Sequence, residues 1–285
     1  MTWLIAGAVT ISFAPILVKV SDVSPTVSAF YRMLFGGGVL LFFFLVTAAW
    51  HLPRLQVVLG MVLAGGFFAI DLFFWHRSIL LIGPGLATLL AGFQVFVMAF
   101  VAATFFSERL TTTVVLMVLL AFVGVGLIVS PTIEQTDKNF LLGVTYGLIT
   151  AFAFAGVLLT LKFTKRQSVD HKSALLEVVL VSLSAAVFLA ILSWFNDESL
   201  VLANRNQLMV LFAYGLVAQI GWVMVNRGVT GVTAIVVGLG LLLEPVLALL
   251  WEALFFGMSH TPIQLAGAAL AMMAIFVVAK GRRAP

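Results

Sequence analysis

The chain contains no cysteine, which excludes disulfide bonds and thiol chemistry. Charged residues are scarce as well: they make up 9% of the 285 residues, whereas water-soluble proteins contain about a quarter. Hydrophobic residues make up 63%, and the mean hydropathy is +1.21. A soluble domain has no use for so much apolar surface, so the composition predicts an all-α, polytopic membrane protein.

Signatures of catalysis are also absent. The sequence has no H-E-x-x-H motif, no P-loop and no G-x-S-x-G motif. The four histidines show no metal-ligand spacing, and the net charge of +4 does not suggest nucleic-acid binding. We therefore expect no enzyme, no cofactor and no metal site, and any transport must be driven by a gradient rather than by ATP.

Long apolar runs, separated by short breaks at Pro, Gly and charge clusters, predict ten membrane-spanning helices, since about 20 apolar residues cross a bilayer. The expected spans are residues 3–20, 26–48, 57–79, 84–106, 112–130, 140–162, 172–194, 206–226, 232–256 and 262–279. No break between them is long enough to hold a soluble domain.

Lys and Arg predict the orientation, because they concentrate on the cytoplasmic side. With the N-terminus inside, ten lie in cytoplasmic breaks and four on the opposite side, while Arg32 lies within a span. This bias predicts a multi-pass protein of the cell inner (plasma) membrane with both termini in the cytoplasm.

The chain resembles itself at an offset of 150 residues. Arg77 falls on Arg227, and "FFSERLT" falls on "FFGMSHT". Gln94 likewise falls on Glu244. We expect a first repeat over 1–139 and a second over 140–285. Each would hold five spans, and an odd number forces opposite topology, as in the inverted repeats of secondary transporters, whose substrate site lies near the midplane.

The residues at these positions resemble a known family. "SAFYRMLFGG", "LATLLAGFQVFVMAFVAATFFSERLT" and "LLLEPVLALLWEALFFGMSHTPIQLAGAALAMMAIFVV" are similar to the second, fourth and last two helices of EamA-type permeases of the drug/metabolite transporter superfamily. The resemblance implies ten helices in two repeats, a central cavity, and export of small metabolites such as amino acids and amines. One departure is Met258, which stands where the family has Glu, while Glu108 keeps the acid in the first half.

Charges inside a membrane span are rare and usually paired. Arg32 and Asp71 both lie about 10–12 Å below the outer face of their spans, at 1.5 Å per residue. We therefore predict an Arg32–Asp71 ion pair, which either fixes the helix packing or opens to hold a substrate or a proton. For His76 and Arg77, at the outer end of the same span, the preferred interpretation is contact with lipid headgroups.

Further polar and aromatic residues inside the spans are candidates for substrate binding. Glu244 precedes a proline near mid-depth, and Trp75 shares a helix face with Asp71. The complete candidate set is Asp71, Trp75, Gln94, Tyr214, Gln219, Trp222, Asn226 and Glu244. Packing explains the Gln219–Trp222–Asn226 stripe as well as binding does, and an interfacial aromatic belt is the alternative for Trp75.

The sequence thus predicts a secondary active transporter that exports small metabolites through the bilayer by alternating access. A proton is the candidate coupling ion, carried by Glu244 or Asp71. The alternative is a membrane-embedded enzyme or lipid-handling protein that uses the same cavity.

Overall fold

The computed structural model describes residues 2–47, 54–105, 111–133, 138–165, 174–229, 234–258 and 260–281. These residues form helices and short connections, and no strand occurs among them. The helices are α1 (Thr2–Ile11), α2 (Ala14–Val20), α3 (Pro25–Thr47), α4 (Leu55–Ile82), α5 (Pro84–Ala91), α6 (Gln94–Phe105), α7 (Thr112–Ile133), α8 (Lys138–Lys165), α9 (Ala174–Phe195), α10 (Arg205–Val229), α11 (Ala234–Phe256) and α12 (Pro262–Gly281). The protein is therefore all-α, as the composition predicts.

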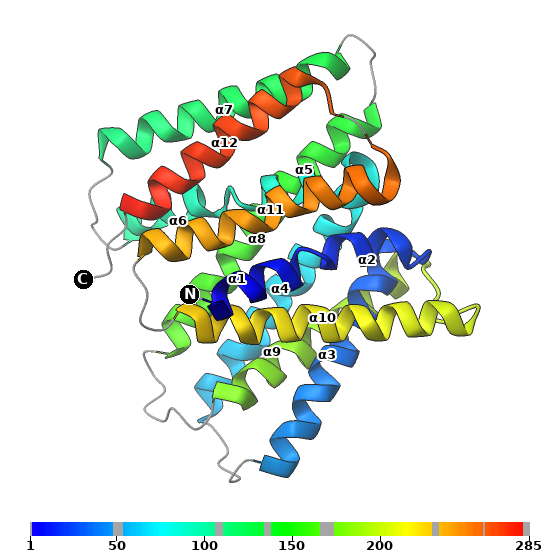
Figure 1. Ribbon diagram of the computed structural model, residues 1–285. Coiled ribbons are helices and arrows are strands. Elements are labelled where there is room, and N and C mark those ends of the chain that lie inside the picture. The colour runs from blue at the N-terminus through cyan, green and yellow to red at the C-terminus, as the bar shows by residue number, and fades with distance from the viewer. Residues whose placement is uncertain are drawn as a thin grey trace.

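The helices match the expected membrane spans. Six stretches are long and apolar enough to cross a bilayer: α1 with α2, α3, α4, α8, α9 and α10. Shorter apolar stretches belong to α5 with α6, α7 and α12, and α11 is 23 residues long. The start of α1 and the end of α12 lie at the same end of the bundle (Figure 1), as an even number of crossings requires. We call this the terminal end and the opposite one the distal end.

Two of the predicted spans consist of two helices each, which corrects the prediction of single helices over 3–20 and 84–106. In the first, Pro15 lies in the first turn of α2 and has no N–H to continue the hydrogen bonds of α1. In the second, Gly92 ends α5, and its N–H bonds the carbonyls three and four residues earlier. By contrast, α11 continues through Pro245.

The helices pack in a pattern that repeats under exchange of the two halves. Helix α4 packs on α8 as α10 packs on α1 and α2, and α4 packs on α9 as α10 packs on α3. The pairs α3 with α9, α5 with α11, and α7 with α12 each join corresponding spans. In Figure 1, α7 and α12 run together along one flank of the bundle, and α3 and α9 lie near the other. This pattern is that of a pseudo-two-fold axis that relates the two halves of the chain.

Small residues allow the closest helix contacts, as expected in lipid, where packing rather than the hydrophobic effect holds helices together. Gly143 and Gly147 of α8 let α4 and α5 approach: an added Cβ would lie 2.8 Å from Leu81 at the first and from Leu90 at the second. Together with buried Ala151 and Ala155 they form one contact face on α8, at a spacing of four residues. Gly124 and Gly267 do the same where α7 meets α12.

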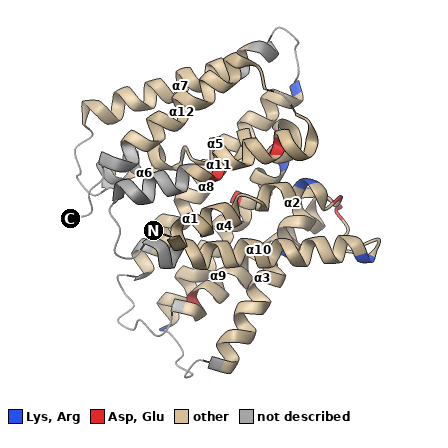
Figure 2. Cartoon of the chain, viewed as in Figure 1, with Lys and Arg blue, Asp and Glu red and all other residues tan. Residues whose placement is uncertain are grey.

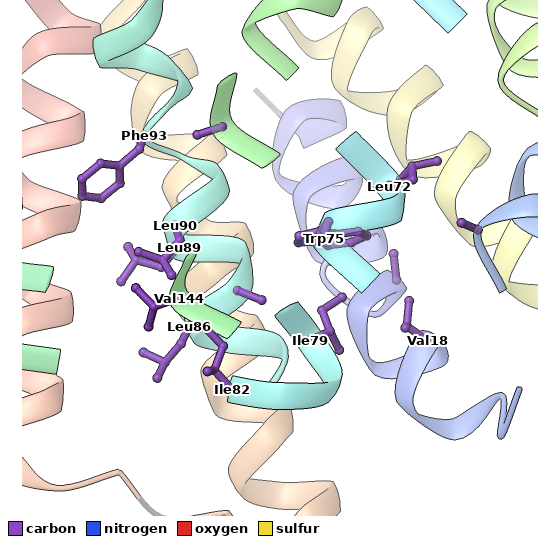
Figure 3. Packing of buried hydrophobic residues seen from close by; sticks show 14 of the residues in the cluster. Val18, Leu72, Trp75, Ile79, Ile82, Leu86, Leu89, Leu90, Phe93 and Val144 are labelled. Carbon is purple, nitrogen blue, oxygen red and sulfur yellow. The ribbon is translucent and has the colours of Figure 1, made fainter. Parts of the chain in front are cut away.

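Apolar side chains fill the interior and also cover the outside. Trp75, Leu86 and Leu90 belong to one buried cluster at the centre of the bundle (Figure 3). On the outer surface Phe42 and Phe152 are 63% and 66% exposed. Such exposed apolar side chains are suited to contact with lipid acyl chains and not with water. Figure 2 shows that charged residues are sparse along the described helices.

Candidate functional site

A cavity of about 340 Å³ lies in the middle of the bundle, between helices of both halves. Its charged and amide side chains are Arg32, Asp71, Gln94 and Glu244. Its aromatic side chains are Phe68, Trp75, Phe154, Trp222 and Phe276. The volume falls in the range of pockets that hold small organic ligands, and an apolar wall with a few converging polar groups is typical of such pockets.

Asp71 and Glu244 face this cavity without a partner. Asp71, on α4, is 6% exposed, and Glu244 lies on α11 beside Pro245. Neither carboxylate makes a hydrogen bond or an ion pair with any residue that the structure describes. A carboxylate removed from water is costly unless it is neutralised or paired. Each of these groups therefore calls for a proton or for a cationic ligand in the cavity.

Arg32 supplies the positive charge of the cavity wall. It lies on α3, is 4% exposed, and donates a hydrogen bond from Nη1 to the Tyr214 hydroxyl over 3.0 Å. Three rings surround its guanidinium carbon, with centroids at 5.3 Å (Tyr214), 5.5 Å (Trp75) and 5.8 Å (Phe68). Its Nε is buried and has no partner among the described atoms. One edge of the guanidinium is thus fixed while another is left for a ligand.

The predicted Arg32–Asp71 ion pair is not formed. Among the described residues the only ion pairs within 4.0 Å are Arg77–Glu198 and His260–Glu252. The depth argument was sound, because Arg32 and Asp71 line the same cavity. The guanidinium turns instead to a neutral hydroxyl and to aromatic faces, which offer it hydrogen bonding and cation–π attraction. This arrangement leaves the carboxylate of Asp71 facing the cavity.

Five of the eight candidate binding residues line the cavity: Asp71, Trp75, Gln94, Trp222 and Glu244. Two of them offer unused polar atoms, because the indole nitrogen of Trp75 and the Oε1 of Gln94 are buried without a hydrogen-bond partner. Such atoms are costly in an apolar interior unless a ligand or water satisfies them. Gln94 and Glu244, which the repeat aligned, both line this cavity.

The other three candidates do not line it. Tyr214 is fully buried behind Arg32. Gln219 points toward α9, where its amide donates to Ser182 Oγ over 3.1 Å and its stem packs on Gly36. The Asn226 side chain lies outside the described residues. Helical spacing placed Gln219 and Trp222 on one stripe, because they are three residues, less than one turn, apart. In the structure only Trp222 of the two faces the cavity, and Gln219 faces the neighbouring helix.

His76 and Arg77 belong to the interior and not to the lipid headgroups, which corrects the sequence-based interpretation. His76 is 0% exposed, and the Arg77 side chain is 16% exposed. Arg77 pairs with Glu198, which follows α9, and also donates to Thr26 Oγ1 over 3.0 Å. Glu198 in turn accepts hydrogen bonds from the backbone N–H and hydroxyl of Thr26 at the start of α3. This cluster joins the start of α3, the end of α4 and the segment after α9 at the distal end of the bundle.

A second polar contact ties α11 to the break between α4 and α5. Glu252 is fully buried and accepts a hydrogen bond of 2.9 Å from the Gly85 N–H in the first turn of α5. His260 Nε2 lies 3.6 Å from the same carboxylate. An acid at a helix N-terminus satisfies a backbone donor and interacts favourably with the helix dipole. Glu252 is therefore a structural contact of the distal end and not a cavity residue.

The geometry just described has counterparts among known proteins. The sequence model of the EamA-like transporter family matches residues 1–130 and, a second time, residues 141–280. The chain belongs to the EamA-like transporter family. Several solved structures are similar as well. One, titled "Crystal structure of protein", superimposes with a TM-score of 0.64 and 18% identity, over 98% of this chain and 95% of its own. At that identity the likeness concerns the fold alone. A search of curated proteins gives no match.

Two hydroxyl residues of this EamA-like transporter line the cavity without having been singled out from the sequence. Thr88 of α5 and Thr150 of α8 face the space between the halves. Thr150 donates to the backbone carbonyl of Asp71 over 3.3 Å, and Thr88 to that of Pro84 over 2.7 Å. Threonines are common in membrane helices and often bond backbone carbonyls, so the sequence offered no signal that these two face a cavity.

The absence of the ion pair leads to a stability prediction. Asp71→Asn removes a carboxylate without a partner, so we expect the melting temperature of the detergent-solubilised protein to stay the same or rise. Arg32→Met loses the Tyr214 hydrogen bond and three ring contacts, which should lower stability by about 1–3 kcal/mol. If Asp71→Asn instead melts early and Asp71→Asn/Arg32→Met recovers the wild-type value, the two residues form a pair after all.

Proposed function

We propose that this EamA-like transporter exports small metabolites, of the amino acid or amine class, by alternating access. The observation that carries the proposal is the central cavity with two carboxylates, Asp71 and Glu244, that face it without a partner among the described residues. A fixed structural role would have paired these groups, since buried charges are otherwise costly. A substrate or proton that comes and goes explains why they are left open.

The polar groups of the cavity suit a ligand with an ammonium group. Carboxylate oxygens of Asp71 and Glu244 accept from such a group, and the Oε1 of Gln94 is a further free acceptor. The Nε of Arg32 has no partner among the described atoms, so it has a hydrogen bond to offer to a carboxylate such as an amino acid carries. Five aromatic side chains provide faces for an apolar body and for the cation itself.

Outward movement is supported by the shape of the cavity. Its lining reaches toward the terminal end at Leu158, Val225 and Phe276, each within two turns of the end of its helix. The distal end is closed by the Arg77–Glu198 cluster and by Glu252. In this proposal the protein lies in the inner membrane with both termini in the cytoplasm, so the terminal end faces the cytoplasm. The cavity therefore takes its ligand from that side.

Alternating access then requires the two halves to rock about the cavity, with the boundary at residues 139 and 140. This boundary falls in the first turn of α8, which begins at Lys138. We propose a proton as the coupling ion, bound by Glu244 or Asp71 when the substrate leaves. Release of a cationic ligand and uptake of a proton would then keep the cavity close to electrical neutrality.

Flux into vesicles tests the function. Purified protein in liposomes, supplied with a panel of labelled amino acids and amines, should accumulate at least one compound against its gradient when a pH gradient is imposed, and an ionophore that dissipates the gradient should abolish this. Asp22→Asn, which changes an exposed carboxylate at the distal end, serves as the matched control and should keep the full rate. A complete absence of protein-dependent flux over the panel would contradict the proposal.

A further inference from the structure

A chain of buried hydrogen bonds leads from Arg32 to the distal end. Arg32 Nη1 donates to the Tyr214 hydroxyl over 3.0 Å, and this hydroxyl lies 2.9 Å from His76 Nε2. On the other side of the ring, His76 Nδ1 lies 2.6 Å from Ser28 Oγ. Ser28 Oγ donates to the carbonyl of Pro25 over 2.9 Å. The chain thus joins α3, α10 and α4 and returns to the first turn of α3.

The direction of the bonds in this chain follows from the groups at its two ends. The carbonyl of Pro25 only accepts and lies 3.1 Å from His76 Nδ1, so in the neutral ring Nδ1 carries the proton and faces this carbonyl and Ser28 Oγ. His76 Nε2 is then the acceptor and takes the hydrogen bond of the Tyr214 hydroxyl, whose oxygen accepts from Arg32. Ser28 Oγ donates to the Pro25 carbonyl. In this arrangement each donor faces an acceptor.

The chain ends where the distal end is closed. Thr26, one residue after Pro25, bonds Glu198 through its N–H and its hydroxyl, and it accepts from Arg77. Arg77 is the neighbour of His76 on α4. The first turn of α3 therefore holds both the end of the buried chain and the centre of the distal closure, so it cannot leave α4 without breaking the bond from His76.

We propose that Tyr214 and His76 are positioning residues, which fix the orientation of Arg32 in the cavity and link it to the closure of the distal end. While the distal end is closed, the chain holds one edge of the guanidinium on Tyr214 and leaves its Nε for the ligand. When the first turn of α3 moves away, His76 Nδ1 loses its hydrogen-bond acceptor. The imidazole is then no longer held in place, so the bond between His76 Nε2 and the Tyr214 hydroxyl is no longer oriented. The state of the distal end thereby determines how Arg32 meets a ligand.

The protein has no native cysteine, so a single introduced thiol reports on the distal end. Ser21→Cys suits this purpose, because Ser21 is 1% exposed and lies at the end of α2, in the connection to α3. Its rate of labelling by a membrane-impermeant maleimide measures how often the distal end opens. Arg32→Lys keeps the charge but loses the geometry of the Tyr214 bond. We expect it to raise the labelling rate about tenfold, the effect of losing one buried hydrogen bond of a charged group.

The decisive measurement repeats Arg32→Lys in two backgrounds. In Tyr214→Phe, which keeps the ring and deletes the hydroxyl, the link is already broken, so Arg32→Lys should cause no further increase. In the matched control Tyr31→Phe, which deletes a hydroxyl bonded to the Leu200 carbonyl at the same end, the tenfold effect should persist. His76→Gln interrupts the chain one link later and serves as the second variant should Tyr214→Phe not fold.

Two results would overturn the proposal. One is an Arg32→Lys effect of equal size in the Tyr214→Phe and Tyr31→Phe backgrounds, which would mean that Tyr214 only contributes to packing. The other is an unchanged labelling rate in Arg32→Lys itself. Neither depends on knowing the substrate, so a failure here leaves the proposed transport function to be judged on its own experiment.

Discussion

Glu244→Gln is expected to lower the rate of substrate flux about 100-fold while the protein remains folded. The carboxylate makes no hydrogen bond or ion pair with any described residue, so its loss removes no structural bond. A charge-assisted hydrogen bond to a ligand is worth about 1.5–3 kcal/mol, and each 1.4 kcal/mol corresponds to about a factor of ten. The amide can neither carry the coupling proton nor offer a charge to an ammonium group. Flux into liposomes and the melting temperature are the two measurements.

The controls separate charge from shape. Glu244→Asp keeps the carboxylate and should retain much of the flux, whereas Gln94→Ala, which removes the aligned amide, should reduce flux by a smaller factor. Both should melt near the wild-type temperature. Wild-type flux in Glu244→Gln together with Gln94→Ala would show that the substrate does not bind between these two positions.

The largest loss of stability is expected for Gly83→Ala. Gly83 joins α4 to α5 with φ 90° and ψ 160°, a conformation that is essentially restricted to glycine. An added Cβ would also collide with the carboxylate of Glu252, which is fully buried and bonded to Gly85. Strain and collision together should cost about 3 kcal/mol or more, and the displaced Glu252 would leave the start of α5 without its cap.

Two other glycines divide this effect into its parts. Gly257 also has a positive φ, of 61°, but nothing lies within 4 Å of an added Cβ, so Gly257→Ala should cost only the strain of about 1–2 kcal/mol. Gly126→Ala, within α7, meets neither obstacle and should be neutral or slightly stabilising. Thermal unfolding in detergent gives all three values. Equal melting temperatures for Gly83→Ala and Gly257→Ala would show that Glu252 yields to the methyl group.

Much of the candidate site could be predicted from position along the spans. The offset of 150 residues brought Gln94 and Glu244 to equivalent depths, and both line the cavity. Depth also placed Arg32 and Asp71 at the same level, and both line it too. A helix advances 1.5 Å per residue, so distance from the end of a span gives depth directly.

Direction could not be predicted in the same way. Tyr214 and Gln219 were expected in the cavity and lie behind its wall, whereas His76 was expected at the headgroups and is fully buried. When a helix rotates about its axis, a side chain that faced the cavity comes to face a neighbouring helix or the lipid, while its depth in the membrane stays the same. The hydrogen-bond partner of Arg32 depends on such rotations. Arg32 bonds Tyr214 and not Asp71 because α10 lies where the Tyr214 hydroxyl is within its reach.

By itself, then, the sequence determined a ten-span helical membrane protein of the EamA-like family and the depth of its polar groups. Both follow from the thickness of the bilayer, because crossing it requires a set length of apolar helix. Only the tertiary structure decided the partner of Arg32, the open carboxylates of Asp71 and Glu244, and the capping of α5 by Glu252. Those contacts join residues far apart in the chain, so they exist only once the helices have taken their rotations and neighbours.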